Sequence, residues 1–500
     1  MAGARILVVD AGGRGNAIAH AFARSPSVER VFVAPGNAGS SLLQKCSQAD
    51  GSQIKGIDEM LSFAERNRID LTFVGPEGYL SAGIVDAFEE RGLNIVGPER
   101  RAAVLEGSKC WTKDLLSEIG VPVPPYRNFD DPDEAKEFVN QFYDAHPTEN
   151  LVVKADGLAA GKGSVVCSSR DEALSTVERI MVDPRIFGDA GSKIEIERRL
   201  EGRELMFFAI ADGKTILPLE SAMDYKQAFA PDEITAIRLF NRLSGNPNLE
   251  NNPNTGGMGG FSPHPWLDDD LTEKIMSRIA RPTMRRVYDM GLRYKGFIYF
   301  GLMIVERDGE REPYVLEINV RLGDPEAEVI LPRLRTDMYE LSNALLDQRL
   351  NEIELEWSPE YHLGVCAVSG RVVKPLSSGS EERPGYPGAH YTNIPIRGLD
   401  KVDPDVLVYH NGTAFGDSGK IYTTGGRVLT LVARGTSLSE ARSKAYDNIK
   451  RIRFNGMRYR RDIGLTPELS SGVLTPLFSI TRPVYAIIDP LSPMKRLSGR

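Results

Sequence analysis

Short apolar runs alternate with amphipathic stretches over residues 1–104. Within the runs the apolar residues are continuous, as in parallel strands buried on both faces, and between the runs they recur with helical spacing. This alternation predicts a doubly wound, parallel α/β domain whose strands end in Gly- or Pro-containing turns, where such folds bind ligands. The predicted strands are 4–10, 29–36, 71–77 and 93–99, and the predicted helices are 17–25 and 57–67.

Beyond a Pro-rich break at 121–126, the pattern becomes mixed up to about residue 330. Several apolar runs have the lengths and flanking turns of antiparallel strands, so we predict an α+β core for 105–330. The predicted strands of this core are 150–156, 163–169, 193–200, 204–213, 214–220, 296–305 and 313–320.

A third region, 331–465, begins with a helix-like stretch at about 332–348 and predicts a further mixed α+β domain. The remaining residues, 466–500, are rich in Pro, Ser and Thr and match no motif, so we expect an extra, partly mobile tail. The predicted strands of the third region lie near 364–373, 406–412, 420–425 and 427–435, before a helix at 437–452.

The composition is that of a globular protein and narrows the choice of partners. A net charge of −8 gives no general attraction to nucleic acid or to an anionic membrane. No apolar run is long enough to span a bilayer, and the N-terminus lacks the pattern of a signal peptide. Widely spaced cysteines disfavour disulfides and metal clusters, so we expect reduced thiols in a cytoplasmic protein; these cysteines are Cys46, Cys110, Cys167 and Cys366.

The strongest chemical signal is a lysine followed by a Gly-rich turn between two predicted strands. Glycines let backbone N–H groups approach phosphate oxygens, and lysines add positive charge for a polyphosphate. The spacing differs from a Walker A loop, which leads into a helix. We interpret the turn as a phosphate-binding loop, with a tight hairpin bearing exposed lysines as the alternative. The residues concerned are Lys154, Gly157, Gly161, Lys162 and Gly163.

A second signal lies on the predicted strand 313–320 and just beyond it. Glu317, Asn319 and Arg321 are two residues apart, so they project from the same face. Carboxylate and amide oxygens suit Mg²⁺, and an arginine beside them can neutralise a transferred phosphoryl group. The alternative is the polar face of a half-buried strand.

Three further segments carry weaker signals. Glu197 and Glu204 flank a turn that can place a carboxylate on ribose and backbone on adenine, or can be a charged hairpin. The segment 254–260 contains four glycines and is either an anion cradle or a flexible loop. The turn at 12–16 precedes a helix like a nucleotide loop but lacks a true G-x-G-x-x-G. The scattered histidines are expected to be structural, including His20, His264 and His410.

Taken together and in this order, the motifs resemble the phosphoribosylamine–glycine ligase family of the ATP-grasp superfamily. The resemblance runs from about residue 5 to 465. It is carried by PGNAG (35–39), VGPE (74–77), LEGSK (105–109), KADGLAAGKG (154–163), FGDAG (187–191), PNTGGMG (253–259), LEIN-R-GDPE (316–326), GYPG (385–388), GGRVL (425–429) and RRDIG (460–464).

The resemblance implies a carbon–nitrogen ligase of purine biosynthesis, which uses ATP with Mg²⁺ or Mn²⁺. It would join glycine to 5-phosphoribosylamine through an acyl phosphate. It also implies an N-terminal domain (1–104), an ATP-grasp domain (105–330) with a small lid at about 123–194, and a C-terminal domain (331–465). We expect a monomer or a homodimer.

The resemblance further assigns roles to individual residues. Lys109 and Lys154 would contact ATP phosphates, and the loop 157–164 would close over them. Adenine would lie near Glu197 and ribose near Glu204, with the metal on Glu317 and Asn319. The catalytic residues would be Arg321, Asp324 and Lys226. The substrates would contact the N-terminal loops, the 253–259 loop and the C-terminal domain, through Gly13, Arg14, Asn37, Glu77, Asp224, Asn254, Thr255, Gly256, Gly257 and Met258.

The chain departs from the family pattern near the expected substrate site. The first loop has Gly15 and Asn16 where the family has Glu and His, and the segment before 253–259 has Tyr225 and Gln227 in place of His and Arg. The Glu that usually follows Glu197 is Arg198, and the segments at about 228–252 and before GYPG are longer than usual.

These changes leave two alternatives to a glycine ligase. One is a paralogous ligase that joins another amine to another acid in specialised metabolism, because a lost polar partner alters specificity sharply. The other is a non-catalytic ATP-binding regulator on the same fold. The presence of Lys154, Glu317 and Asn319 argues against the regulator.

Overall fold

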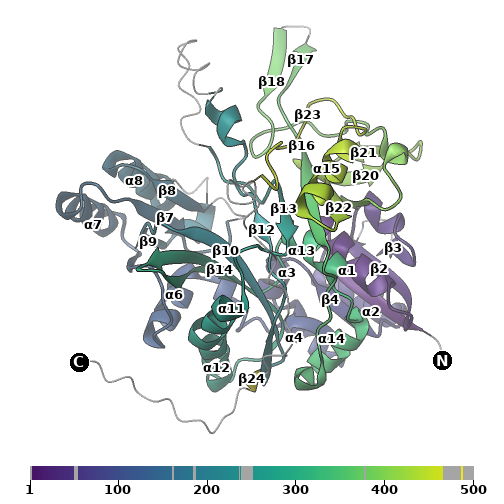
Figure 1. Cartoon of the computed structure of the whole chain (residues 1–500), viewed down its shortest axis with the longest axis horizontal. Helices are drawn as coiled ribbons and strands as arrows, with labels where there is room; N and C mark the ends of the chain where they lie inside the picture. Colours follow the sequence, from purple (N-terminus) through teal and green to yellow (C-terminus); the bar gives the residue numbers. More distant parts are fainter. Residues whose placement is uncertain are drawn as a thin grey trace.

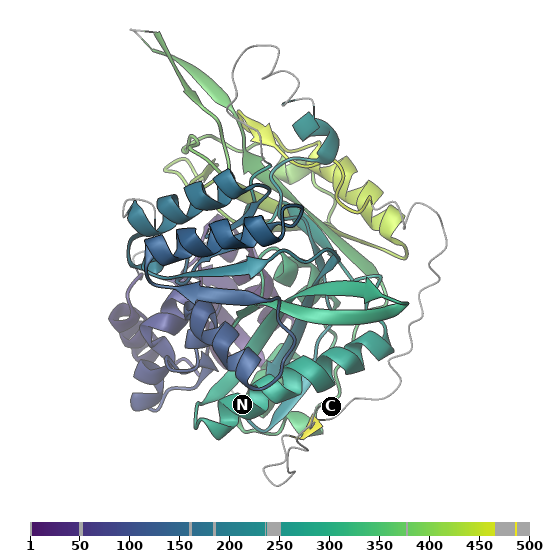
Figure 2. The same cartoon turned by 90° about the vertical axis from the view of Figure 1, so that its left-hand side faces the viewer.

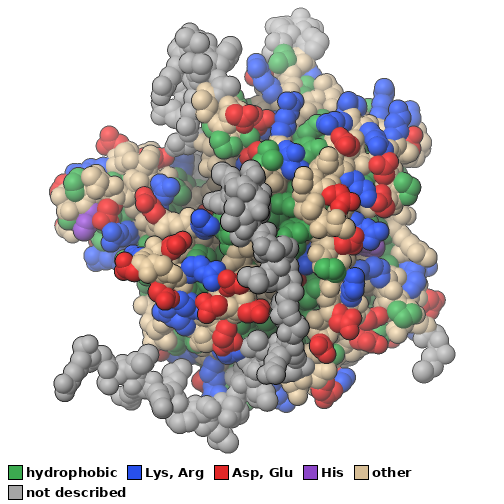
Figure 3. All heavy atoms as spheres, in the orientation of Figure 1, with side chains coloured by type: hydrophobic (Ala, Val, Ile, Leu, Met, Phe, Trp, Pro, Cys, Tyr) green, Lys and Arg blue, Asp and Glu red, His purple; other side chains and the backbone are tan. Residues whose placement is uncertain are grey.

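The structure is a computed structural model that describes residues 3–49, 54–159, 163–183, 187–235, 237, 252–376, 379–465 and 486–487. Gly161 and Lys162 therefore lie outside the described residues, as do most of the 228–252 segment and of the tail. Red and blue side chains are interspersed over the face shown in Figure 3, as expected for a mixed-charge surface. Among the described residues, no helix is both long and apolar enough to cross a membrane.

The N-terminal region forms the predicted α/β fold. Four buried strands pair in parallel in the order β5-β4-β1-β2, and a short strand that the pattern did not predict, β3, joins the edge. The strands are β1 (Ala4–Asp10), β2 (Val28–Pro35), β3 (Cys46–Gln48), β4 (Leu71–Val74) and β5 (Ile95–Pro98); the helices are α1 (Gly13–Ala23), α2 (Ile57–Arg66), α3 (Glu77–Ala82) and α4 (Ile84–Glu90).

This sheet continues into the central region without a break. Strand β5 pairs antiparallel with β14 (Tyr294–Arg307), so Tyr294 lies opposite Pro98. Strand β14 then pairs with both β10 (Arg203–Ala211) and β15 (Glu310–Asn319), which makes a ten-stranded sheet. The strand with Glu317 and Asn319 is thereby fixed to the N-terminal loops. Strands β11 (Thr215–Pro218) and β24 (Ala486–Ile487) complete this sheet.

A separate four-stranded sheet lies within the predicted lid. Its order is β6-β9-β7-β8, and Figure 2 shows helices α7 and α8 side by side over one face. Strand β9 ends at Arg198, a little beyond the expected limit of the lid. The elements are β6 (Tyr126–Phe129), α7 (Pro132–Ala145), β7 (Leu151–Ala155), β8 (Ser164–Cys167), α8 (Arg170–Val177) and β9 (Ile194–Arg198).

The C-terminal sheet includes two strands from earlier in the chain. Its order is β12-β13-β16-β22-β19, with β23 beside β16, so the segment around Asp224 and Gly259 packs with the C-terminal region. Figure 1 shows this sheet beside the N-terminal strands, with the β17–β18 hairpin projecting from it. The strands of this sheet are β12 (Met223–Asp224), β13 (Gly259–Ser262), β16 (Tyr361–Ser369), β19 (Leu407–His410), β22 (Arg427–Gly435) and β23 (Met457–Arg458). Two separate two-stranded sheets are formed by β17 (Val372–Leu376) with β18 (Gly379–Arg383) and by β20 (Thr413–Phe415) with β21 (Ile421–Thr423).

The remaining helices connect these sheets. Helix α6 begins where the side chain of Ser108 accepts the N–H of Trp111, and α15 begins at a similar serine cap, Ser437. These helices are α5 (Val104–Gly107), α6 (Lys109–Glu118), α11 (Asp269–Ile275), α12 (Arg281–Asp289), α13 (Glu326–Ile330), α14 (Met338–Leu346) and α15 (Leu438–Ile449).

Candidate functional site

Two lysines and two glutamates form a buried cluster between the lid sheet and β15. Lys154 on β7 lies 2.6 Å from Glu197 Oε1 and 3.2 Å from Glu195 Oε1. Lys113 on α6 lies 2.9 Å from Glu197 Oε2 and 3.4 Å from Glu195 Oε1. Glu195 and Glu197 face the same side of β9 because they are two residues apart. We call Lys113, Lys154, Glu195 and Glu197 the lysine–glutamate cluster.

The charges of the lysine–glutamate cluster control its protonation. Burial alone would raise the pKa of Glu197, but the two ammonium groups outweigh it and lower the pKa to about 2. Burial raises the pKa of Glu195, and the neighbouring Glu197 adds to the effect, although both lysines oppose it. Burial lowers the pKa of Lys154, yet the two carboxylates outweigh it and the net shift is upward. Lys154 is therefore a permanently charged group.

The cluster also connects the lid to β15. Lys154 Nζ donates to the carbonyl oxygen of Leu316 at 2.9 Å, and Lys113 Nζ donates to that of Val315 at 3.2 Å. Leu316 immediately precedes Glu317, so the lysine predicted to bind phosphate is held beside the residue predicted to bind metal. Lys113 was not recognised in the sequence, because a lysine on an amphipathic helix is usually solvated.

The loop after Lys154 is anchored at both ends of its described part. Lys109 Nζ donates to the carbonyl oxygen of Gly157 at 3.2 Å, and Asp156 accepts from Ser108 Oγ at 2.9 Å. At the other end, the carbonyl oxygen of Gly163 accepts the N–H of Ala155 at 2.8 Å. Lys109 and Lys154 thus enter the same region from α6 and β7.

Glu317 lies at a point where several cations converge. Burial would raise its pKa, but Lys226, Lys154, Lys109 and Arg321 together lower it to about 2. The nearest of these, Lys226 Nζ, is 3.6 Å from Glu317 Oε1 and 4.0 Å from Glu204 Oε2. Glu317 and Glu204 both remain partly exposed. An anionic carboxylate open to ligands therefore lies among lysines from three segments.

The donors on β15 fit a divalent cation that also binds phosphate. Glu317 offers a carboxylate and Asn319 an amide oxygen, from the same face of the strand, and Asn319 Nδ2 is buried without a hydrogen-bond partner. No group of three or more His, Cys, Asp or Glu suited to a metal occurs in the part of the chain that the structure describes. Mg²⁺ needs no such group, because it keeps phosphate oxygens and water as ligands.

Arg321 is held by two carboxylates from the N-terminal side. Its Nη2 donates to Glu106 Oε1 at 2.8 Å, and its Nε lies 3.2 Å from Glu77 Oε2. Nη2 also donates to Asn319 Oδ1 at 3.1 Å. Burial lowers the pKa of Arg321, but Glu106 and Glu77 outweigh it and raise the pKa above its usual value. Glu77 therefore orients Arg321 in this structure. The substrate-binding role predicted for Glu77 remains a prediction.

The N-terminal Gly-rich turn is occupied by the protein's own oxygens. The N–H of Gly12 donates to Asp10 Oδ1 at 2.7 Å, and the N–H of Gly13 donates to Asn411 Oδ1 at 3.1 Å. Arg14 pairs with Asp10 at 2.8 Å. Asn37 Nδ2 donates to the carbonyl oxygen of His410 at 2.6 Å. In this structure these amides make hydrogen bonds within the protein, and the substrate roles of Gly13, Arg14 and Asn37 stay predictions.

The 253–259 loop is folded back on the segment 224–226. The N–H and Oγ1 of Thr255 both donate to the carbonyl oxygen of Lys226 at 2.8 Å. Gly257 has φ +111°, and a Cβ there would lie 2.3 Å from Cδ of Pro325 and 3.0 Å from Asp224 Oδ1. Only glycine fits this approach. Met258 is fully buried and Asn254 bridges to Gln227, so these two predicted substrate residues contribute to the scaffold of the loop.

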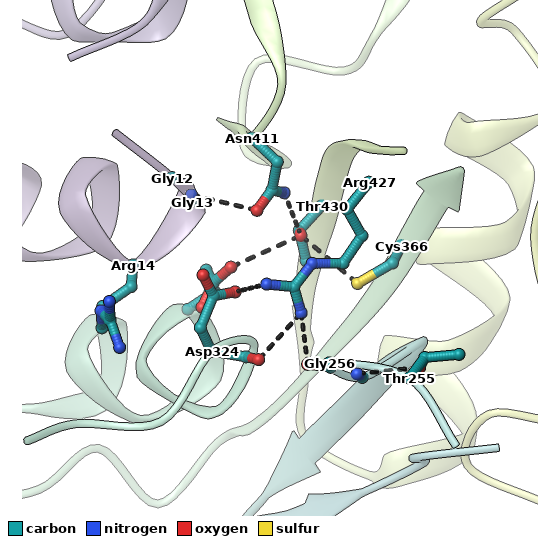
Figure 4. A network of polar contacts seen from close by, with 12 residues as sticks. Gly12, Gly13, Arg14, Thr255, Gly256, Asp324, Cys366, Asn411, Arg427 and Thr430 are labelled. Carbon is teal, nitrogen blue, oxygen red and sulfur yellow. Dashed lines mark hydrogen bonds and ion pairs between the residues drawn. The ribbon is translucent and has the colours of Figure 1, made fainter. Parts of the chain in front are cut away.

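Three loops meet around Asp324, and Figure 4 shows that side chains of the C-terminal region hold them together. We call Gly12–Gly13, Thr255–Gly257 and Asp324–Pro325 the three-loop junction. Arg427 Nη2 lies 2.7 Å from Asp324 Oδ1, and Arg427 Nη1 donates to the carbonyl oxygens of Asp324 and Gly256. Arg427 belongs to the GGRVL motif (425–429), for which the sequence predicted no individual role.

A second set of contacts reaches the junction through Asn411. While its Oδ1 accepts from Gly13, its Nδ2 donates to Thr430 Oγ1 at 2.9 Å. Thr430 in turn lies 3.5 Å from Glu328 Oε1. Burial raises the pKa of Glu328 well above its ordinary value, with the charge of Asp324 adding to the effect. No local motif marks Asn411, because its partners lie far from it in the sequence.

The positions that depart from the family pattern are tied into the scaffold. Asn16 donates to Asn37 Oδ1 at 3.1 Å and accepts the N–H of His410 at 2.9 Å. Tyr225 packs in the C-terminal core, and its hydroxyl accepts the N–H of Gly464 at 3.0 Å. Gln227 is exposed, and Arg198 pairs with Glu149 at the far end of β9. Within the described part of the chain, no hydrogen bond or ion pair joins any of these four side chains to Arg321, Asp324 or Glu317.

The histidines behave as structural residues, as predicted. Burial lowers the pKa of His20 to about 4, of His264 to about 3 and of His410 to about 4. Each is therefore neutral near pH 7.

Models of one family match the chain in the order in which its regions occur. They describe phosphoribosylglycinamide synthetase: its N domain matches residues 4–106, its ATP-grasp (A) domain 107–327 and its C domain 383–466.

Full-length relatives agree. The phosphoribosylamine–glycine ligase of Archaeoglobus fulgidus is 47% identical over 483 residues, which cover 93% of this chain and 100% of the relative. That of Caldanaerobacter subterraneus is 39% identical, covering 92% of this chain and 99% of the relative.

Solved structures give the same picture. The crystal structure of the phosphoribosylamine–glycine ligase of Thermotoga maritima has a TM-score of 0.71 and 28% identity, covering 92% of this chain and 100% of that one. A biotin carboxylase from Campylobacter jejuni, in complex with an ATP analogue, has a TM-score of 0.62 at 14% identity and covers 94% of this chain and 97% of that one. At that identity the likeness concerns the fold alone.

Proposed function

The chain belongs to the phosphoribosylglycinamide synthetase family, and from this membership we propose that it joins glycine to 5-phosphoribosylamine, forming glycinamide ribonucleotide, ADP and phosphate. It is an ATP-dependent carbon–nitrogen ligase with an ATP-grasp fold. Its substrates are small molecules.

One observation carries the assignment of the site. Four cations, Lys109, Lys154, Lys226 and Arg321, lower the pKa of Glu317, and its strand leads directly to Arg321 and to the Asp324 turn. A single strand and its extension therefore connect a place suited to a metal-bound triphosphate with the junction of three loops. A ligase needs this adjacency, because the activated acid must form within reach of the amine.

We assign the nucleotide to the side of the lysine–glutamate cluster. Lys109 and Lys154 neutralise its phosphates, Gly157 and Gly163 belong to the loop beside them, and Glu204 is open to the ribose. Both carboxylate oxygens of Glu197 are bound to lysines, so this side chain is not free to bind the ribose. We assign it the role of holding Lys154 in place. Mg²⁺ or Mn²⁺ on Glu317 and Asn319 would supply charge neutralisation for the transferred phosphoryl group.

The first step activates glycine. A carboxylate is a poor electrophile, so an oxygen of glycine attacks the γ-phosphorus of ATP, ADP leaves, and a glycyl phosphate forms. Lys226 and Arg321 stabilise the charge on the transferred group, because both side chains reach the space around Glu317. Glu77 and Glu106 already orient the side chain of Arg321, so it loses little conformational entropy when it binds the transferred phosphoryl group.

The second step forms the amide. The amine of 5-phosphoribosylamine attacks the acyl carbon, phosphate leaves with the electron pair of the acyl C–O bond, and the nitrogen releases one proton to the departing phosphate or to solvent. We place this amine at the three-loop junction, with Gly13, Arg14, Asp224, Asp324 and the 254–258 loop around it. Exclusion of water there prevents hydrolysis of the acyl phosphate.

Oligomeric state and location form a separate proposal. We propose that the enzyme acts in the cytoplasm as a monomer or a homodimer. All four cysteines are free thiols, which suits a reducing compartment. Sedimentation of the purified protein measures the oligomeric state.

The different-substrate alternative is the one worth testing. It was motivated by Asn16, Tyr225 and Gln227, whose side chains serve the scaffold in this structure rather than the space around Asp324. That placement favours glycine and 5-phosphoribosylamine as the substrates.

An ATP-turnover screen decides between the alternatives. ADP release should require glycine and 5-phosphoribosylamine together, the latter formed from ribose 5-phosphate and ammonia. Other amino acids and amines serve as matched controls. Turnover with another pair and none with this one would mean a paralogous ligase; no turnover with any pair would favour a regulator.

A further inference from the structure

Arg427 joins two loops that lie far apart in the sequence. It is the first residue of β22, and its side chain is largely buried. Its Nη1 donates to the carbonyl oxygens of Gly256 and Asp324, the latter at 2.8 Å, while its Nη2 lies 2.7 Å from Asp324 Oδ1. One guanidinium thus binds both the Thr255–Gly257 loop and the Asp324–Pro325 turn.

The Thr255–Gly257 loop has few contacts of its own. Two of its three residues are glycines, so Thr255 is the one residue of this loop with a side chain that can form hydrogen bonds. Beyond the contact of Thr255 with Lys226, the N–H of Gly256 donates to the hydroxyl of Tyr386 at 2.9 Å and its carbonyl oxygen accepts from Arg427. Both backbone groups of Gly256 are therefore held by side chains of the C-terminal region, and Figure 4 shows the contact with Arg427.

The third loop meets the same carboxylate. A Cβ on Gly12 would lie 3.2 Å from Asp324 Oδ2, so the N-terminal turn packs against the side of Asp324 that faces away from Arg427. Displacing Asp324 would then move all three loops relative to one another.

We propose that Arg427 is a positioning residue for the amide-forming half of the reaction, holding the three-loop junction in the shape that orients the amine substrate. The proposal rests on the function proposed above, because it assigns that amine to this junction. Among the described residues, its hydrogen bonds and ion pair are with Asp324 and Gly256 and not with the lysine–glutamate cluster or Glu317, so we assign Arg427 to the amide-forming half.

The geometry requires a planar, two-sided donor. The guanidinium donates in two directions at once, toward a backbone carbonyl and a carboxylate. A lysine keeps the charge but offers one nitrogen on an unbranched chain, so it cannot keep all three contacts with the carbonyl oxygens of Gly256 and Asp324 and the carboxylate of Asp324. Arg427→Lys is therefore the informative change, because it keeps the positive charge and loses the forked geometry.

Two assays on the full-length enzyme separate the half-reactions. In the first, hydroxylamine traps glycyl phosphate formed from ATP and glycine without the amine. In the second, amide formation is followed with 5-phosphoribosylamine made from ribose 5-phosphate and ammonia. For Arg427→Lys we expect a KM for the amine raised at least ~10-fold and amide formation lowered by about 100-fold, with trapping within about 3-fold of wild type.

Matched variants complete the test. Arg434→Lys alters an exposed arginine on the same strand, which pairs with Glu360, and should leave both assays unchanged. Tyr386→Phe removes the other contact of Gly256 and should raise the KM for the amine in the same direction by about 3-fold. It keeps the proposal testable if Arg427→Lys does not fold.

Three outcomes would overturn the proposal. A parallel fall of trapping and amide formation would mean that Arg427 supports the whole site, and unchanged amide formation would mean that the bridge has no role. A wild-type enzyme that makes no amide from this pair overturns the proposed function together with the inference. An active wild type with unaffected variants overturns the inference alone.

Discussion

The two halves of the site are built in different ways. The nucleotide side consists of charged side chains that project from strands and one helix and pair with one another, as Lys154 and Lys113 pair with Glu197. The three-loop junction consists of backbone groups of glycine-rich loops, held by uncharged or bridging contacts from Asn411 and Arg427.

This difference assigns different tasks to the two halves. A strand-based set of charges is rigid and presents the same field to any nucleoside triphosphate. Loops held by a few distant side chains take their shape from the surrounding fold, so small changes there can retune the choice of amine. Substitutions that remove a charge should therefore impair the nucleotide side most. Substitutions that shift a loop should impair the three-loop junction most.

The largest effect is expected from Lys154→Met. It removes the ammonium between Glu195 and Glu197 and leaves their carboxylates with Lys113 alone. We expect ATP turnover to fall at least ~1000-fold and the protein to lose about 3 kcal/mol of stability. ADP release and urea unfolding measure the two quantities. Lys136→Met, which breaks an exposed pair with Glu178, is the control; similar losses there would refute a special role of burial.

Glu317→Gln should have the next largest effect. The amide keeps the size of the side chain but loses the anion that we assign to the metal, so ADP release should fall by about 100-fold. The dependence of nucleotide binding on Mg²⁺ should weaken in parallel, as measured by titration calorimetry. An unchanged Mg²⁺ dependence would remove Glu317 from the metal site.

Asn411→Ala should act on the amine alone. It deprives the N–H of Gly13 of its acceptor and Thr430 of a donor, which corresponds to about 10-fold in the KM for 5-phosphoribosylamine. The KM for ATP should not change. Asn94→Ala, which removes an exposed hydrogen bond to Asp70, provides the matched comparison. A rise in both KM values would erase the distinction between the two halves.

The smallest effect concerns stability in mild acid. His410 has a folded pKa of about 4, below its ordinary value, because burial disfavours its charged form. The unfolded chain binds a proton below about pH 6.5. Stability is therefore lost as the pH falls from 6.5 toward 4, by about 1 kcal/mol per pH unit for this residue.

Urea unfolding at pH 6.5 and 5.5 measures that loss. The variant His410→Asn should lose about 1 kcal/mol less than wild type between these pH values. Glu197, with a pKa of about 2, remains ionised throughout this range. Equal losses in both proteins would contradict the buried neutral state of His410.

Local patterns predicted much of the fold and one half of the site. Continuous apolar runs marked β1, β2, β4 and β5, and alternation on β15 grouped Glu317 with Asn319, because both signals are contained in a few neighbouring residues. Lys113 escaped notice because its partners lie on other elements. Arg427 and Asn411 could not be predicted because they bind backbone carbonyl and N–H groups. Every residue type carries these groups, so the residues that are bound have no sequence signal.

The pairing of strands was equally hidden. Apolar runs show that a segment is a strand but not which strand lies beside it. That β12 and β13 join the C-terminal sheet follows from long-range packing, and so does the continuation of the N-terminal sheet through β5 and β14.

The β5–β14 pairing has a consequence for how the enzyme admits its substrates. A hinge between the N-terminal and central regions would have to pull apart neighbouring strands and leave their peptide groups unpaired in the interior, which is expensive. Opening motions should therefore be confined to the separate four-stranded sheet and its two helices. The contacts of Lys154 and Lys113 with β15 would be the pivot of this motion. Hydrogen exchange would then be slow in the ten-stranded sheet that the N-terminal and central regions share, and faster in the four-stranded sheet with α7 and α8.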